Sequence, residues 1–292
     1  MRLLFVTTLL ALFVAPGWAA TPIDEIADAH PRGDVEVSNV AGEIKVTGWD
    51  KEQVKVTGSL GKGTELVFER DGRRTLVKAE VPSRTRNVGS SDLYIMVPEE
   101  SRVTVTGVSA DISVTGVKGA LRIQSVSGEI VTEVFEEDVE TKTVSGDFQI
   151  RGHDQPALLT LTTVSGNGRV DGIRGELVVQ SVTGDLDIRS EVLDRARLRT
   201  TNGDIDLQAG LGSDALFDME AINGDLRLDI LGDVDAYFDI ETFNGSIDNS
   251  FGPDPVRTSK YAPGRELRFT HGEGKARVRI KTLNGGVTLR GS

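Results

Sequence analysis

The sequence predicts an all-β fold, a single-stranded parallel β-solenoid, on three observations. A twelve-residue phrase returns eight times between residues 121 and 292, with spaced apolar residues on either side of a turn built on glycine. Short runs rich in Val, Ile, Thr and Leu alternate apolar with polar residues, which is typical of strands. Beyond the first nineteen residues, no stretch keeps a helical period.

The chain begins with the pattern of a signal peptide. Arg2 precedes an apolar run over residues 3–14, and residues 15–19 end in the small Ala19 that export cleavage requires. The run is shorter than the roughly 20 apolar residues of a membrane-spanning helix. We therefore expect cleavage after Ala19, a signal peptide over 1–19, and a mature protein in the periplasm, outside the cell or on its surface.

After an extension over residues 20–34, a β-strand-repeat domain is expected over residues 35–292. Its first part fits the phrase around Gly42 and then becomes irregular, with short strands between residues 54 and 97. Regular repeats follow over 103–247, beginning with a unit that has Ala110 in the glycine slot. A Pro- and Gly-rich excursion over 248–276 and a closing rung over 277–290 complete it. Atypical ends are what a repeat array needs to hide its open edges, so the C-terminal part is predicted to be a cap.

The turn glycines set the period. Their spacings are 18, 20, 18, 19, 21, 21 and 40 residues, and the last gap is interpreted as two periods with one concealed unit. We expect positive φ at these positions, because glycine tolerates it and other residues resist it. The predicted structural turn glycines are Gly128, Gly146, Gly166, Gly184, Gly203, Gly224, Gly245 and Gly285.

Two architectures use this phrase. In an antiparallel meander of β-hairpins, the glycine lies in a two-residue turn. The apolar residue just before the turn would then point outward, whereas in a solenoid it could fill the inside of a corner and stack on its counterpart. We favour the solenoid, right-handed by the usual crossover rule, with the meander as the alternative. The residues assigned to the inner corner are Val126, Val144, Val164, Val182, Ile222, Phe243 and Leu283.

The slots beside the glycine carry polar residues. The preceding slot changes from Ser or Thr to Asn at residues 202, 223, 244 and 284, which predicts a stacked amide ladder. The following slot is mostly Asp or Glu, which predicts a column of carboxylates that accept turn N–H bonds. If a Ca²⁺ site exists, Asp185, Asp204 and Asp225 are its candidates, because hard cations prefer carboxylate oxygens.

No catalytic or cofactor-binding residue is predicted. His30, His153 and His271 lie in different segments, and no nucleophile elbow or metal motif surrounds them. Rungs of 18 to 21 residues leave little length for the walls of a catalytic cleft. The sequence therefore predicts a protein that is not an enzyme and that uses no cofactor.

Charge and cysteine content narrow the partners. The net charge of -12 opposes nucleic-acid binding, because phosphates would be repelled. Zero cysteines exclude disulfides, thiolate metal sites and a lipid-modified cysteine at the cleavage point. From residue 249 onward nine Lys or Arg stand against three acids, so the C-terminal region is basic while the body is acidic. End-to-end self-association through that region is one predicted contact.

The order of features resembles the bacterial putative-adhesin family of exported β-strand-repeat proteins, a domain of unknown function. The matching stretches are Val35 to Trp49, Asp92 to Pro98 leading into Val103 to Val114, the serial Ser/Asn-Gly-Asp units, and Glu266 to Leu289. The resemblance implies a β-helix-like domain at the cell envelope.

The function expected from the sequence is a non-enzymatic cell-envelope module that binds an envelope protein or polymer. The alternatives are a glycan-acting β-helix enzyme and a self-associating structural rod.

Overall fold

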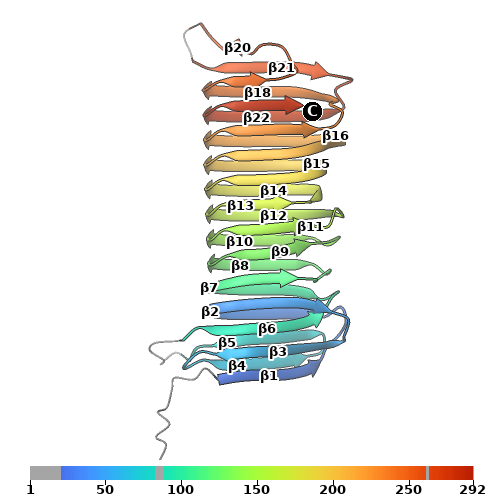
Figure 1. Cartoon of the computed structure of the whole chain (residues 1–292), viewed down its shortest axis with the longest axis vertical. Helices are drawn as coiled ribbons and strands as arrows, with labels where there is room; N and C mark the ends of the chain where they lie inside the picture. Colours follow the sequence, from blue (N-terminus) through green and yellow to red (C-terminus); the bar gives the residue numbers. More distant parts are fainter. Residues whose placement is uncertain (1–20, 83–88, 261–262, 292) are drawn as a thin grey trace, which may run out of the picture.

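The computed structural model describes residues 21–82, 89–260 and 263–291, and within them every regular element is a β-strand. The 23 strands form one hydrogen-bonded sheet that is mostly parallel and coils into an elongated rod (Figure 1). The predicted signal peptide over residues 1–19 lies outside this part of the chain. No helix in the described ranges is long and apolar enough to cross a membrane.

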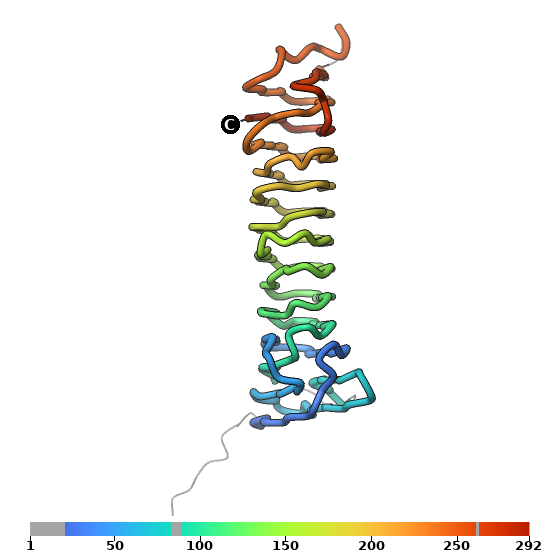
Figure 2. Tube along the Cα trace, turned by 90° about the vertical axis from the view of Figure 1, so that its right-hand side faces the viewer, coloured from blue at the N-terminus to red at the C-terminus, as the bar shows by residue number. Residues whose placement is uncertain are grey.

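Each regular rung consists of two short strands joined by a tight turn at the repeat glycine. β8 (Leu121–Ser127) and β9 (Ile130–Val134) make one rung, and β10 (Val139–Ser145) and β11 (Phe148–Gly152) make the next. Both strands of one rung pair in parallel with their counterparts in the next. The first strands therefore stack into one wall and the second strands into another, as the side view in Figure 2 shows. This parallel stacking confirms the solenoid and not the meander.

The stack continues along the chain in the same way. The following elements are β12 (Pro156–Ser165), β13 (Gly168–Asp171), β14 (Arg174–Thr183), β15 (Leu186–Asn202), β16 (Ile205–Asn223) and β17 (Leu226–Leu231). β15 and β16 are long because each belongs to the second wall of one rung and then to the first wall of the next. The two walls are thus one continuous sheet.

The core lies between the two walls. Alternate residues of each strand point inward and stack on the equivalent residue of the next rung, as Leu161, Val179, Leu198 and Met219 do. These four side chains are at most 1% exposed. Burying each one contributes about 1.5–3 kcal/mol, so the repeated apolar slots are what hold the rungs together.

The inner corner at the glycine turn holds small side chains, and the sequence-based assignment of the apolar residues to it is wrong. Ser125, Thr143, Thr163, Ser181 and Thr200 are buried there. The next residue continues the in-out alternation and points away from the core, because the tight corner leaves room for only one small side chain. The misassigned residues are 44–50% exposed: Val126, Val144, Val164, Val182, Ile222, Phe243 and Leu283.

The outward residues form a line along one edge of the rod, which we call the apolar ridge. Val40 and Val108 extend it by two rungs at the N-terminal end, at 41% and 44% exposure. Thr201 occupies the slot between Val182 and Ile222. The full ridge, in spatial order, is Val40, Val108, Val126, Val144, Val164, Val182, Ile222, Leu283 and Phe243.

The N-terminal end contains antiparallel strands. β2 (Asp34–Trp49) and β7 (Arg102–Thr115) each cross both walls and pair in parallel. On its other side β2 pairs with β5 (Arg74–Glu80) and β6 (Ser91–Pro98), which together make one rung. The outermost pairings are antiparallel: β3 (Gln53–Leu60) pairs with β6, β4 (Glu65–Asp71) pairs with β5, and β1 (Thr21–Asp28) pairs with β3.

The C-terminal end departs from chain order. β22 (Ala276–Asn284) lies between β16 and β18 (Ala236–Asn244), and β23 (Val287–Gly291) lies between β17 and β19 (Ile247–Asn249). The rung formed over 277–290 is therefore the last in sequence but not the last in the stack (Figure 1). No concealed repeat fills the 40-residue gap: among its described residues are β20 (Val256–Arg257) and β21 (Arg265–His271), and β21 pairs antiparallel with β18.

Charge explains why the last rung is inserted. On the outer face of the first wall, Lys281 lies opposite Glu220 on one side and Glu241 on the other. Its Nζ is 2.8 Å from Glu241 Oε2. Arg279 lies in the same way between Asp218 and Asp239. If β18 stacked directly on β16, these acids would face each other, and like charges directly opposite on neighbouring strands are destabilising.

Candidate functional site

The turn glycines lie in a column along the edge of the rod, where successive backbones touch. A Cβ atom on Gly184 would lie 2.1 Å from the carbonyl oxygen of Gly166, and one on Gly203 would lie 2.2 Å from that of Gly184. The predicted positive φ is present at Gly128, Gly166, Gly184, Gly203, Gly224 and Gly285, but not at Gly146 or Gly245. Close backbone approach is therefore the requirement that all eight share, since Gly146 and Gly245 would also meet a carbonyl oxygen at 2.1 and 1.9 Å.

The predicted amide ladder is present beside the glycines. Asn223 donates from Nδ2 to Oδ1 of Asn202, Asn284 to Asn223, and Asn244 to Asn284, at 2.8 to 2.9 Å. The ladder follows the spatial order of the rungs, so it includes the inserted C-terminal rung. Its role is structural, because it hydrogen-bonds four rungs side chain to side chain.

Carboxylates form a second line on the other side of the glycines, which we call the acidic column. Its Asp side chains accept backbone N–H bonds from the next rung: Asp185 Oδ1 from Asp204 N at 2.9 Å, and Asp204 Oδ1 from Asp225 N at 2.7 Å. Asn167 takes the same position and accepts from Asp185 N at 3.0 Å. The acidic column comprises Glu43, Asp111, Glu129, Asp147, Asp185, Asp204 and Asp225.

The Ca²⁺ candidates Asp185, Asp204 and Asp225 lie on consecutive rungs, as expected. In each, one carboxylate oxygen is bonded to a backbone N–H of the next rung. No group of three or more His, Cys, Asp or Glu side chains within residues 21–82, 89–260 and 263–291 is arranged to hold a metal ion. The observed role of these three carboxylates is to accept a backbone N–H bond at the turn of the next rung.

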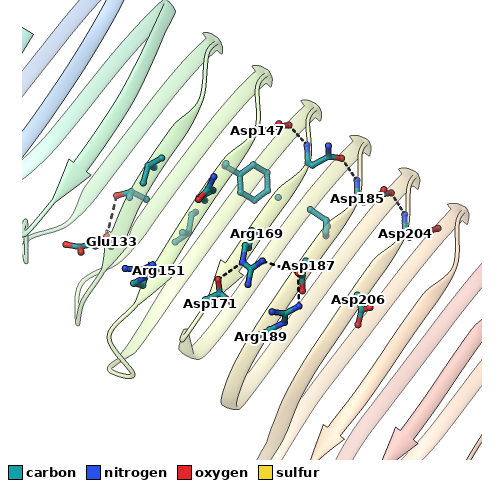
Figure 3. A pocket seen from close by; sticks show the side chains of 18 of the residues that line it. Glu133, Asp147, Arg151, Arg169, Asp171, Asp185, Asp187, Arg189, Asp204 and Asp206 are labelled. Carbon is teal, nitrogen blue, oxygen red and sulfur yellow. Dashed lines mark hydrogen bonds and ion pairs between the residues drawn. The ribbon is translucent and has the colours of Figure 1, made fainter. Parts of the chain in front are cut away.

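The outer face of the second wall has a shallow depression of about 1040 Å³ that spans several rungs. Figure 3 shows its centre, where Arg169 lies between Asp171 and Asp187, and Asp187 also contacts Arg189. Arg169 Nε is 2.8 Å from Asp171 Oδ2, and Arg189 Nη2 is 3.1 Å from Asp187 Oδ2. The hydrogen bond and charge of Asp171, together with the charge of Asp187, raise the pKa of Arg169.

The depression continues in both directions with the same alternation of charge. At one end Arg227 Nη1 is 2.8 Å from Asp206 Oδ2, and hydrogen bonding to Asp206 raises the pKa of Arg227. At the other end Glu133 and Arg151 line the wall. This arrangement presents hydrogen-bond donors and acceptors in fixed positions over a long, open surface. We call it the charged wall.

Sequence reasoning did not single out the charged wall. Its signal is a pair of opposite charges that flank one inward residue, as in Arg169-Val170-Asp171 and Asp187-Ile188-Arg189. Because alternate residues of a strand share a face, such pairs meet on the outer surface. The cross-rung contact between Arg169 and Asp187 also requires the 18-residue register, which the glycine spacing provides.

The three histidines contact different partners and form no common site. His153 stacks on Phe135 with ring centroids 4.2 Å apart, and its Nε2 is 3.8 Å from Glu133 Oε1. His271 packs edge-on against Phe251. His30 accepts a hydrogen bond at Nδ1 from the backbone N–H of Arg32. Each has a local packing or hydrogen-bonding role in its own loop or strand.

The comparison with family models decides the classification. The model of the Toastrack DUF4097 family, a domain of unknown function, matches residues 34–290. The chain belongs to the Toastrack DUF4097 family. This confirms the predicted membership of a family of β-strand-repeat proteins whose domain is of unknown function. No curated protein matches the Toastrack chain.

Three solved structures resemble the Toastrack chain at low sequence identity. A putative cell adhesion protein from Clostridium sporogenes is 10% identical, with 93% of this chain and 100% of that chain covered and a TM-score of 0.24. A putative lipid binding protein from Parabacteroides distasonis is 13% identical, with 92% and 96% covered and a TM-score of 0.46. A putative adhesin from Parabacteroides distasonis is 11% identical, with 93% and 98% covered and a TM-score of 0.28.

Proposed function

We propose that this Toastrack chain is an exported, non-enzymatic binding module of the cell envelope. The observation that carries the proposal is the charged wall, which is long, open and shallow rather than deep and enclosed. Pockets for small substrates are concave and mostly apolar, with a few convergent polar groups. A row of fixed Asp and Arg side chains over several rungs suits an extended polar chain, either a polymer or a protein segment.

The proposal includes several properties predicted from the sequence. The signal peptide over 1–19 directs export to the periplasm, the cell surface or the medium, so N-terminal sequencing of the mature protein should begin at Ala20. The solenoid is right-handed, and the antiparallel strands at its two ends act as caps against edge-to-edge aggregation. Recovery of an uncleaved, membrane-bound product would contradict the export part of this proposal.

Retention of an envelope component by the mature chain is the decisive experiment. Residues 20–292 are immobilised and exposed to solubilised native envelope, beside the double variant Arg169→Gln, Arg189→Gln. The matched control is Arg195→Gln, because Arg195 forms a similar exposed ion pair with Glu176 on the other wall. We expect the wild type and the control to retain the same component and the double variant to lose it. Equal retention by all three chains, or none by the wild type, contradicts the charged wall as the binding surface.

End-to-end self-association through the basic C-terminal region is kept as a separate hypothesis. Part of that positive charge is already paired within the chain on the outer face of the rod, where Lys281 pairs with Glu241 and Arg268 pairs with Asp239. Sedimentation equilibrium of the mature chain at low and high salt tests it, since an association driven by charge should weaken as salt increases.

A further inference from the structure

The apolar ridge is a surface that nothing in the rod covers. Its members stack on one another along the edge, yet nine large apolar side chains remain 41–50% exposed. Together they leave several hundred Å² of continuous apolar area, which on a soluble protein marks an interaction site. The ridge reaches from Val40 to Phe243 in spatial order and is interrupted only by the polar Thr201.

The ridge also has a hollow at its C-terminal end. Ile222, Leu283 and Phe243 line a depression of about 510 Å³ that begins next to Thr200. Its polar border consists of Arg199, Glu220, Glu241 and Lys281. A bulky apolar side chain of a partner could be accommodated there, whereas the rest of the ridge offers a line of contacts.

Charge next to the ridge is strongly one-sided. The acidic column follows the same edge on the other side of the glycines, three positions after most ridge residues, although Val164, Leu283 and Phe243 are followed at that position by Asn167, Gly286 and Ser246. Each Asp of the column that caps a turn uses one oxygen for that bond. In the described ranges Asp171 and Asp206 form ion pairs with Arg, whereas none of the salt bridges there involves the acidic column, and Asp225 attracts Arg227 only at longer range. A line of seven carboxylates with little opposite charge in contact therefore lies along the uncovered apolar line.

This combination defines the partner. We propose that the apolar ridge and the acidic column together bind an amphipathic α-helix of another protein, with its apolar stripe on the ridge and Lys or Arg along one flank. The inference rests on the proposed function in that it makes the chain a binding module, but the apolar ridge lies outside the charged wall. Asp147, Asp185 and Asp204 of the acidic column also line that depression, so the two surfaces adjoin at these residues. A helix laid along the rod repeats its stripe about every 5.4 Å, close to the roughly 4.8 Å between rungs, so the two lines stay matched over about four rungs.

Symmetry and charge argue against the other occupants. Two copies whose ridges meet in antiparallel fashion about a two-fold axis would also place acidic column against acidic column. A parallel two-fold pair centred on the ridge would bury ridge against ridge but leave the two acidic columns on opposite flanks, without opposite charge from the partner's column. An anionic membrane surface would be repelled by the same seven carboxylates. A basic helix satisfies both lines at once.

The test uses a synthetic helical peptide with a Leu stripe and Lys along one flank, and a second peptide with Glu in place of Lys. The rod variant Val144→Thr, Val164→Thr, Val182→Thr removes three neighbouring apolar side chains from the middle of the ridge. Threonine is chosen because Thr201 already occupies the equivalent position on another rung. The variant Asp147→Asn, Asp185→Asn, Asp204→Asn removes charge but keeps the Oδ1 acceptor, as Asn167 does naturally. Binding is measured by fluorescence anisotropy at low and high salt, with thermal melts to confirm that each variant is folded.

We expect the Lys peptide to bind the wild type, and the ridge variant to bind it at least about tenfold more weakly, as for contacts at the centre of an interface. The Asn variant should also bind more weakly, with less dependence on salt. The proposal is overturned if the ridge variant binds the Lys peptide as tightly as the wild type does, or if the Glu peptide binds as tightly as the Lys peptide. It is also overturned by a ridge-dependent dimer in sedimentation or by ridge-dependent binding to anionic vesicles. If envelope retention still depends on Arg169 and Arg189 in that event, the proposed function stands while this inference fails.

Discussion

Replacing Gly184 with alanine tests why the repeat requires glycine. Gly184 has φ of +126°, and a Cβ there would lie 2.1 Å from Gly166 O. Because real Cβ contacts essentially never fall below 3.0 Å, the two rungs would have to separate by roughly 1 Å. That movement would break the bonds from Gly166 N to Thr183 O and from Asp185 N to Asn167 Oδ1, which measure 3.1 and 3.0 Å.

The expected cost follows from these terms. Each lost hydrogen bond costs about 1 kcal/mol, and left-handed backbone strain for alanine adds about 1–2 kcal/mol. Gly184→Ala should therefore destabilise the rod by about 3–4 kcal/mol. Gly232 is the matched control, because its φ is +75° and a Cβ there meets nothing within 4 Å. Gly232→Ala should cost only the strain, about 1–2 kcal/mol.

The assay is urea unfolding of the mature chain followed by circular dichroism, with both variants measured against the wild type. A repeat array can unfold in more than one step, so the transition of the repeat region is compared between variants rather than a single global midpoint. If the two variants agree within about 0.5 kcal/mol, backbone strain alone explains the glycine column and the close-approach argument is refuted.

Four further outcomes are expected. Val182→Asp should change stability by less than about 0.5 kcal/mol, whereas Val179→Asp on the same strand, where the side chain is 0% exposed, should cost several kcal/mol in urea melts. Lys281→Glu places a third acid beside Glu220 and Glu241 and should destabilise by about 1 kcal/mol, an effect that 1 M salt should largely remove. Burial alone would raise the pKa of Asp235, but backbone hydrogen bonds from Gly274 and Lys275 outweigh it and hold the pKa below its ordinary 3.8. The carboxylate therefore stabilises the fold above pH 3.8, and this stabilisation is lost as pH falls through the folded-state pKa. Asp235→Asn should flatten the melting temperature against pH in that range, and an unchanged profile would contradict this. Millimolar Ca²⁺ should shift the melt no more than NaCl of equal ionic strength, and a calcium-specific rise abolished by Asp204→Asn would contradict the capping role of the acidic column.

The sequence was sufficient to predict the parallel stack, because the phrase around each glycine repeats with a period near one rung. It also predicted the amide ladder and the register that brings Asp185, Asp204 and Asp225 to consecutive rungs. These features depend on local spacing and on contacts between equivalent positions. Both can be read from a repeating pattern.

The direction of Val182 could not be derived in the same way. The residue directly follows the inward Ser181, and an apolar residue right after an inward one predicts that the backbone turns a corner there and keeps both side chains inside. The corner accommodates one small side chain, so alternation continues and Val182 points out. We attribute the outward apolar residue to the partner surface proposed above, about which the sequence of a single chain carries no direct signal.

The inserted rung was missed for a different reason. β22 has the same phrase as its neighbours, so its apolar pattern fits any place in the stack. Its position depends on the charges of Arg279 and Lys281 against the acids of β16 and β18. That comparison between strands far apart in sequence becomes visible only when the rung register is known.

A distance between spin labels at residues 108 and 222 tests the stacked-rung account most directly. The chain has no cysteine, so Val108→Cys and Ile222→Cys introduce two unique labelling sites at exposed ridge positions. The register passes from Val108 through residues 126, 144, 164, 182 and 201 to Ile222, one rung at a time. Pulsed electron paramagnetic resonance should give about 29 Å at roughly 4.8 Å per rung. A distance near 58 Å, expected for about two strands per repeat in an antiparallel meander, would contradict the parallel solenoid.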